Sequence, residues 1–234
     1  MPGGIRVLAI LLASWSFCGS ACAEILLSRY DVSLDGLHIG DAVLRTSLEA
    51  KHYKVAVSAD VGMLLASTQI QSEASGARAG SKLTPQHFQI TLSGGDQGSV
   101  EVNFGDSSAA AGNGARLRGV FDPLSALLAT SLKPASPSHH PCSGMLPIFT
   151  GRERFDLNLK PKAPAGAQPG RAFVICEATA GTPQPGGGGR PPLDWEIVFQ
   201  KVSKPHFWLV ERVSMSTPKG VVTIDRAETS ISGS

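Results

Sequence analysis

The sequence has little of several features that would identify common classes of protein. Its 234 residues contain only four cysteines, no run of lysines and arginines, and a formal net charge of only +2. Proteins that bind nucleic acid carry a basic patch or stripe, so this charge pattern argues against nucleic acid as a partner. The Gly-rich residues 182–194 lack the Gly-Lys-Ser/Thr ending of a phosphate-binding loop. We expect them to form an ordinary loop, as we do for residues 160–170.

Long hydrophobic runs are also missing, apart from one near the N-terminus. Arg6 precedes an apolar run at residues 7–17, and small residues ending in Ala21-Cys22-Ala23 follow it. This order is typical of a secretory signal peptide, and the run is shorter than the roughly 20 residues that span a bilayer as a helix. We predict a signal peptide at 1–23, one β-rich domain at 24–234, export to the periplasm and no transmembrane span after cleavage. Lipoprotein attachment through Cys22 is the alternative.

Cleavage at that site would leave only Cys142 and Cys176. A pair of cysteines in an exported chain usually forms a disulfide, because exported compartments are oxidising, and this one would close a loop of about 34 residues. His139 and His140 precede Cys142, and with the two cysteines they could supply the four ligands of a zinc site. Adjacent side chains on an extended segment point to opposite sides, however. We therefore predict the disulfide, with a zinc site or a catalytic thiol as alternatives.

Alternation of apolar and polar residues is the strongest structural signal. It marks residues 53–61, 88–92, 100–104, 154–160 and 195–199, and further strands are expected at 26–34, 39–49, 67–74, 171–178, 206–217 and 220–231. A period of two places one face of each strand in a core and the other in water. We predict an all-β, mainly antiparallel fold of about eleven strands in an open or half β-barrel.

One segment, FDPLSALLATSL at 121–132, predicts a short helix instead. Asp122 stands at a natural N-cap and Pro123 at the first helical position. The apolar stripe of this helix consists of Leu124, Leu127 and Leu128. Asp122 and Ser125 could be catalytic, but the sequence shows no third partner for them. We interpret Asp122 as the helix cap and Ser125 as a residue of the helix surface.

Several motifs occur in an order and at spacings that resemble one bacterial family. They are YDVSLDGLHIGDA, LTPQHFQ, FDPLSALL, PCSGMLPIFTGRERFDL and VICEA. Together they resemble the domain-of-unknown-function family numbered 3108, a group of exported proteins, over nearly the whole chain after residue 23. The glycine run replaces a Pro-Val-Ala-Gly-Tyr-like segment that members commonly carry. The resemblance implies an all-β envelope protein of unsettled activity. By analogy of fold, it also implies an open barrel round a helix, similar to bacterial lipoprotein carriers and related β-spiral proteins.

Two classes of function follow from these observations. We predict a non-catalytic envelope protein without a cofactor, whose apolar interior binds a small apolar molecule or lipid, or which binds an envelope protein. The candidate lining residues are Phe155, Leu157, Leu159, Trp195, Ile197 and Phe199. The alternative is a hydrolase or metal-dependent enzyme for envelope material that uses His139, His140, Asp122 and Ser125. A purely structural protein with a filled core is a third interpretation, and an interior cavity would argue against it.

Overall fold

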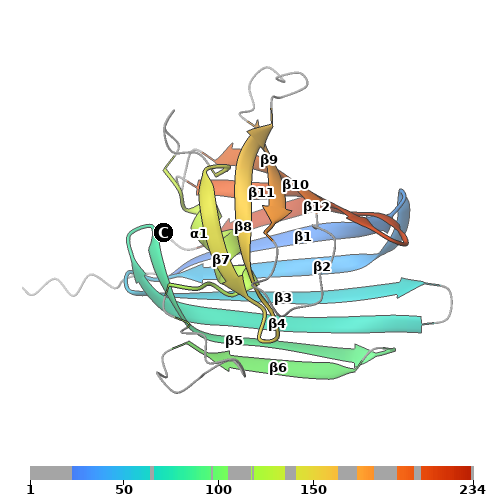
Figure 1. Ribbon diagram of the computed structural model, residues 1–234, viewed down its shortest axis with the longest axis horizontal. Helices are drawn as coiled ribbons and strands as arrows, with labels where there is room; N and C mark the ends of the chain where they lie inside the picture. Colours follow the sequence, from blue (N-terminus) through green and yellow to red (C-terminus); the bar gives the residue numbers. More distant parts are fainter. Residues whose placement is uncertain are drawn as a thin grey trace, which may run out of the picture.

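The structure, a computed structural model, describes residues 23–63, 66–95, 97–104, 117, 119–134, 141–162, 173–181, 194–202 and 207–232. The predicted signal peptide lies outside the described residues except for Ala23, and His139 and His140 also lie outside them. The described part of the chain forms one sheet and one helix (Figure 1). The predicted all-β class with one short helix is therefore confirmed.

The sheet has twelve strands among the described residues. They are β1 (Glu24–Leu34), β2 (Leu37–Leu48), β3 (His52–Met63), β4 (Ala66–Ala79), β5 (Lys82–Gly94), β6 (Gly98–Asn103), β7 (Gly144–Phe149), β8 (Arg154–Lys162), β9 (Phe173–Ala180), β10 (Asp194–Val202), β11 (Phe207–Thr217) and β12 (Gly220–Ser232). Their order is β6-β5-β4-β3-β2-β1-β12-β11-β10-β9-β8-β7, and every neighbouring pair is antiparallel. The first and last strands thus meet inside the sheet, and β6 and β7 are its edges.

The expected count of about eleven strands missed β7. This strand contains Pro147, which has no N–H to donate and so weakens the strand signal in the sequence. β7 tolerates it because it is an edge strand that pairs with β8 on one side. On its other side the Pro147 carbonyl accepts a hydrogen bond from the Phe121 N–H at 2.8 Å, and the Phe149 N–H donates to the Phe121 carbonyl at 2.8 Å.

The loop expected from residue 160 begins later than predicted. β8 continues to Lys162, because Lys160, Pro161 and Lys162 pair with Glu177, Cys176 and Ile175 of β9. Asp194, expected at the end of the second loop, is the first residue of β10. The rest of both predicted loops, residues 163–170 and 182–193, lies outside the described residues.

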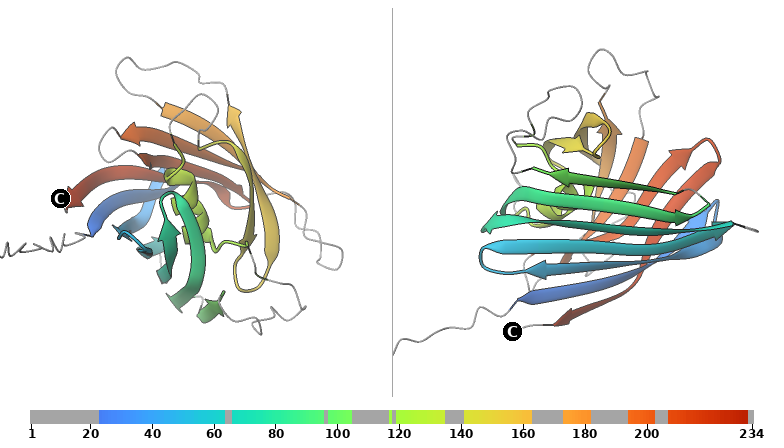
Figure 2. Two further views of the ribbon diagram at one scale, coloured as in Figure 1. Left: turned by 90° about the vertical axis from the view of Figure 1, so that its left-hand side faces the viewer. Right: turned by 90° about the horizontal axis from the view of Figure 1, so that it is seen from below.

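The helix α1 (Pro123–Ser131) lies on the concave side of the curled sheet (Figure 2). Asp122 caps it as predicted: its Oδ1 accepts a hydrogen bond from the Ser125 N–H at 2.8 Å, and Pro123 follows at the first position. The helix contacts β3, β4 and β5 on one side and β7 and β11 on the other. Helix and sheet therefore share one core, and the predicted open half-barrel is confirmed. The likeness to lipoprotein carriers stays an expectation.

The sheet divides where β11 and β12 stop pairing. Their last pair is Arg212 with Asp225; beyond it, β11 continues beside β10 and β12 continues beside β1. We call β12 with β1–β6 leaf A, and β7–β11 leaf B.

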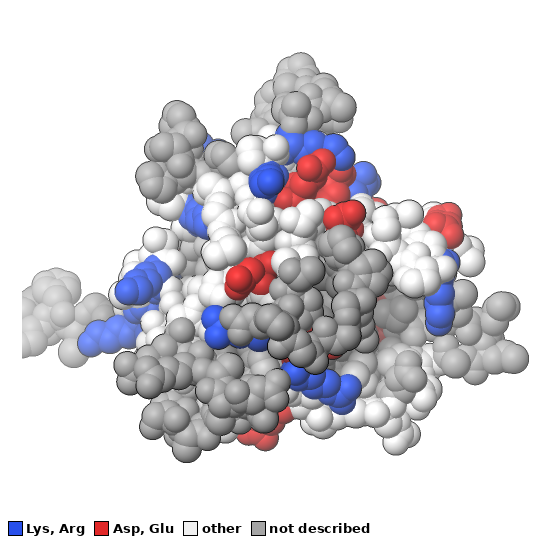
Figure 3. Space-filling model, viewed as in Figure 1, with Lys and Arg blue, Asp and Glu red and all other residues white. Residues whose placement is uncertain are grey.

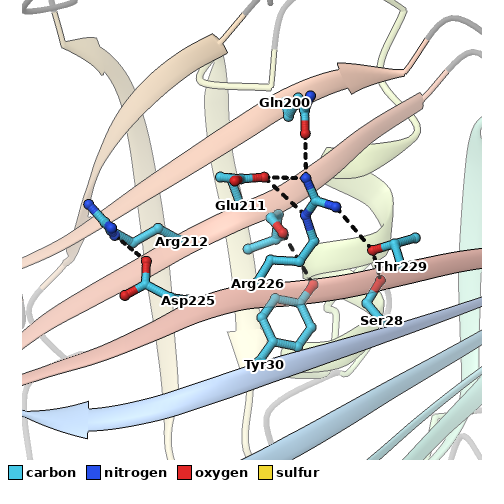
Figure 4. Close-up of polar contacts among 9 residues, drawn as sticks. Ser28, Tyr30, Gln200, Glu211, Arg212, Asp225, Arg226 and Thr229 are labelled. Atoms are coloured by element: carbon cyan, nitrogen blue, oxygen red, sulfur yellow. Dashed lines mark hydrogen bonds and ion pairs between the residues drawn. The ribbon is translucent and has the colours of Figure 1, made fainter. Parts of the chain in front are cut away.

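Polar side chains fill the point of division (Figure 4). Arg226 of leaf A donates from Nε to Glu211 Oε2 of leaf B at 3.0 Å, and its guanidinium also donates to Gln200.

This polar group is mostly shielded from water. The side chains of Arg226 and Glu211 are 16% and 28% exposed. Arg226 Nη1 also donates to Thr229 Oγ1 at 3.3 Å, and that hydroxyl lies 2.9 Å from Ser28 Oγ. A shielded charge is stable only when it is paired, and here the partners of Arg226 on leaf B are Glu211 and Gln200.

Candidate ligand-binding cavity

A cavity of about 540 Å³ lies between α1 and the concave face of leaf B. The sheet contributes residues of β7, β8, β10 and β11, together with Ile224 of β12. The helix contributes residues from Pro123 to Thr130, including Leu124 and Leu127. Most lining side chains are apolar, as in sites that bind apolar small molecules.

The structure places all six predicted lining residues on the wall of this cavity: Phe155, Leu157, Leu159, Trp195, Ile197 and Phe199. They come from β8 and β10, which are not neighbours; β9 lies between them. Two inward residues of β9, Cys176 and Ala178, are small and fully buried. Small side chains in the middle strand leave room between the larger ones on either side. Contact of these six residues with a ligand stays a prediction.

Cys142 and Cys176 form the predicted disulfide. Their Cα atoms are 5.0 Å apart, and both residues are fully buried. The bridge passes over β8 and ties the residue two positions before β7 to β9. It also occupies both thiols, so this structure contains neither the zinc site nor the catalytic thiol that would use Cys142.

Lys133, which follows α1, binds the segment around Cys142. Its ammonium donates to the carbonyl of Pro141 at 3.3 Å and to the carbonyl of Ser143. Burial lowers the pKa of Lys133. The wall of the cavity beside β7 is therefore anchored both covalently and by hydrogen bonds.

The cavity has a polar end at the turn between β7 and β8. Thr150, Arg152 and Glu153 line it there. Thr150 Oγ1 accepts hydrogen bonds from the backbone N–H groups of Arg152 at 3.4 Å and Glu153 at 3.1 Å, which fixes the turn. Of the described residues that line the cavity, only Arg152 and Glu153 have charged side chains.

The proposed catalytic pair Asp122 and Ser125 does come together, but away from the cavity. Ser125 is fully buried rather than on the helix surface, so that interpretation is wrong. Its Oγ lies 2.7 Å from the hydroxyl of Tyr53 on β3. Burial raises the pKa of Asp122, and burial raises the pKa of Tyr53 to about 12. None of these three residues lines the cavity, so their geometry fits an anchor for the helix.

Two further hollows differ from this cavity. One of about 40 Å³ lies on the other side of α1, beside Trp208, whose Nε1 is buried without a hydrogen-bond partner among the described residues. It has room for water but not for a lipid chain. Another, of about 430 Å³, lies over β8–β12, where Lys162 pairs with Glu196 at 2.8 Å and Glu177 at 3.6 Å. Its lining is polar, unlike that of the 540 Å³ cavity, whereas the 40 Å³ hollow has apolar walls but little room.

Asp31, His38 and Asp41 form a group whose ligand atoms lie within 4.8 Å of one another. All three side chains are exposed, as acidic surface groups commonly are, and we assign no metal site to them. On the face shown in Figure 3, the acidic and basic side chains of the described residues lie interspersed. None of the helices in the described ranges has the length and apolar character needed to cross a membrane.

The fold and the cavity together define a class: a curled antiparallel sheet with one helix on its concave face and an apolar cavity between them. The chain belongs to the family described as Protein of unknown function (DUF3108), whose profile matches residues 29–164. The match runs from β1 to two residues past the end of β8 and includes α1; the expected resemblance extended further, to nearly the end of the chain. No curated protein and no solved structure matches the chain.

Proposed function

We propose that this protein is an exported, non-catalytic binding protein of the cell envelope, which holds an apolar ligand such as an acyl chain between α1 and leaf B. The observation that carries the proposal is the cavity itself. Its volume of about 540 Å³ falls within the roughly 300–1,000 Å³ of small-molecule sites. Most of its wall consists of apolar side chains from four strands of leaf B, β12 and the helix.

The same cavity favours binding over the two other functions. A purely structural protein would fill its core with side chains, because protein interiors are close-packed. An enzyme would need a nucleophile or an acid–base pair at the cavity. The charged side chains among its described lining residues are Arg152 and Glu153, which are adjacent in one turn.

Export to the periplasm is supported by the N-terminal sequence and by the disulfide. Disulfides persist in oxidising compartments and are rare in the cytosol. N-terminal sequencing of the purified protein tests this part of the proposal, and we expect the chain to begin at Glu24. A lipid-modified Cys22 at the N-terminus would support the lipoprotein alternative, and an intact Met1 in cytosolic protein would contradict export.

Ligand binding is tested with a matched pair of substitutions on neighbouring strands. Val213 lines the cavity, whereas Val198 points to the opposite face, because its neighbours Ile197 and Phe199 both line the cavity. Both valines are half-buried. Val213→Trp should fill part of the cavity, and Val198→Trp should leave it unchanged.

The measurement is the fluorescence titration of each protein with the apolar dye N-phenylnaphthylamine, beside native mass spectrometry of protein purified from the envelope. We expect the wild type and Val198→Trp to bind the dye equally, Val213→Trp to bind it at least about tenfold more weakly, and a lipid to co-purify. Equal binding by both variants, or no binding by the wild type, would contradict the proposal.

A further inference from the structure

The polar end of the cavity suggests what kind of ligand enters it. We infer that the ligand is an amphiphile with an anionic head group, a carboxylate or a phosphate, and that Arg152 binds this head group while the apolar chain lies in the cavity. The inference rests on the proposed function and adds the chemistry of the ligand to it.

The turn that carries Arg152 has a fixed shape. The Thr150 N–H donates to the Glu153 carbonyl at 3.0 Å, and the Thr150 hydroxyl accepts from the backbone N–H groups of Arg152 and Glu153. Gly151 has a φ of +88°, and its backbone packs against Val100 of β6. The hydrogen bonds of the turn therefore fix the backbone of Arg152 at the end of the cavity.

The guanidinium of Arg152 is exposed, and among the described residues it has no hydrogen-bond or ion-pair partner. Its neighbour Glu153 lines the same end of the cavity but already has an interaction of its own. By contrast, Arg212 is paired with Asp225 and Arg226 with Glu211. The free charge at this end of the cavity is thus the positive one.

An arginine suits an anionic head group for a geometric reason. Its planar guanidinium can donate two parallel hydrogen bonds to a carboxylate or a phosphate. An apolar wall beside the guanidinium lowers the local dielectric and strengthens that attraction relative to open water. Phe155 and Leu157 of β8 line the same cavity as Arg152. The head group of an amphiphile would therefore contact Arg152 while its chain contacts apolar side chains.

The test compares four ligands that share one chain: dodecanoate, dodecyl phosphate, dodecanol and dodecylammonium. Each is titrated against the wild type, Arg152→Gln and Arg154→Gln by displacement of N-phenylnaphthylamine. Arg154 is the matched control, because it is an exposed arginine two residues away that does not line the cavity.

We expect the wild type to bind dodecanoate or dodecyl phosphate about tenfold or more tightly than dodecanol, since a hydrogen bond to a charged group is involved. Arg152→Gln should abolish that preference and keep the affinity for dodecanol, which also shows that the variant is folded. Arg154→Gln should behave as the wild type. The anion that binds with the higher affinity identifies the preferred head group.

Several results would overturn the inference and leave the proposed function intact. They are equal binding of dodecanol and both anions, tightest binding of dodecylammonium, or equal losses in the two arginine variants. If the wild type binds none of the four ligands and not the dye, the proposed function fails, and the inference fails with it.

Discussion

Gly151 lies so close to Val100 that a Cβ added to the glycine would stand 2.0 Å from the Val100 Cγ1. The two residues belong to opposite ends of the sheet, since Val100 is in the edge strand β6 and Gly151 follows the edge strand β7. Phe149 extends the contact, because it packs in a cluster with Phe88 and Val102. Side-chain contact, and not strand pairing, therefore brings the two edges of the sheet together.

Gly151→Ala should destabilise the fold more than Gly80→Ala does. Both glycines have positive φ, +88° and +62°, but a Cβ at Gly80 would have no atom within 4 Å. Gly80→Ala should cost about 1–2 kcal/mol from its backbone conformation alone. Gly151→Ala should cost about 1–3 kcal/mol more from overpacking, measured by urea unfolding. The excess should shrink in a Val100→Ala background; an unchanged excess would show that Val100 is not the obstacle.

Loss of the disulfide should lower the stability of the fold. Replacing both Cys142 and Cys176 by alanine should lower the free energy of unfolding by about 2–5 kcal/mol, because the bridge restricts a 34-residue segment of the unfolded chain. Thiol titration of unfolded, unreduced protein provides the control and should find no free thiol. Two free thiols would mean that the bridge does not form in the purified protein.

The cavity wall should be sensitive to truncation on one face of β8 only. Leu157 is 5% exposed and belongs to the main core cluster, so Leu157→Ala should cost about 2–5 kcal/mol. Asn158, the next residue, points away from the cavity, and Asn158→Ala should change the stability by less than about 0.5 kcal/mol. Equal effects in chemical denaturation would place the wrong face of β8 inward.

The hydrogen bond between Tyr53 and Ser125 should couple the helix to leaf A. Tyr53→Phe and Ser125→Ala each leave a buried hydroxyl without its partner and should each cost about 1–3 kcal/mol. The double variant should cost less than the two single costs added together, because no unpaired hydroxyl remains. Strict additivity in this double-mutant cycle would indicate that the two hydroxyls do not interact.

Asp122 should make the stability of the fold depend on pH. Burial raises its pKa in the folded state above the ordinary 3.8, so the folded protein keeps this proton at a pH where the unfolded chain has lost it. The resulting stabilisation is fully present below pH 3.8 and is lost as the pH rises through the raised pKa. Asp122→Asn keeps an N-cap side chain without the titrating proton.

Urea unfolding of the wild type and Asp122→Asn at a series of pH values checks this prediction. The stability of the wild type relative to the variant should fall as the pH rises over that window. A relative stability that rises instead would show that the N-terminus of α1 stabilises the charged carboxylate more than burial disfavours it.

Local features of the fold could be predicted from the sequence, because they depend on neighbours along the chain. Alternation identified the inward residues of β8 and β10, and Asp122-Pro123 identified the start of the helix. β7 was missed, since Pro147 resembles a break and becomes acceptable only at the edge of a sheet.

Relationships between distant residues could not be predicted in this way. Tyr53 is 72 residues from Ser125, and no pattern in either segment indicates the other. Alternation also does not say which strands are neighbours or how long they stay paired, so the division between β11 and β12 and the pair Arg226–Glu211 were not foreseen. Arg152 was not among the residues expected at a site, because its place at the cavity depends on the turn that Thr150 stabilises.

The hairpin of β7 and β8 is held at its two ends by forces that respond to different conditions. The disulfide from Cys142 holds its base, and apolar contact between Gly151 and Val100 holds its tip. Apolar contacts weaken on cooling, whereas the persistence of a disulfide depends on the reduction potential of its surroundings. A drop in temperature would therefore loosen the end that carries Arg152, and a reductant would loosen the opposite end.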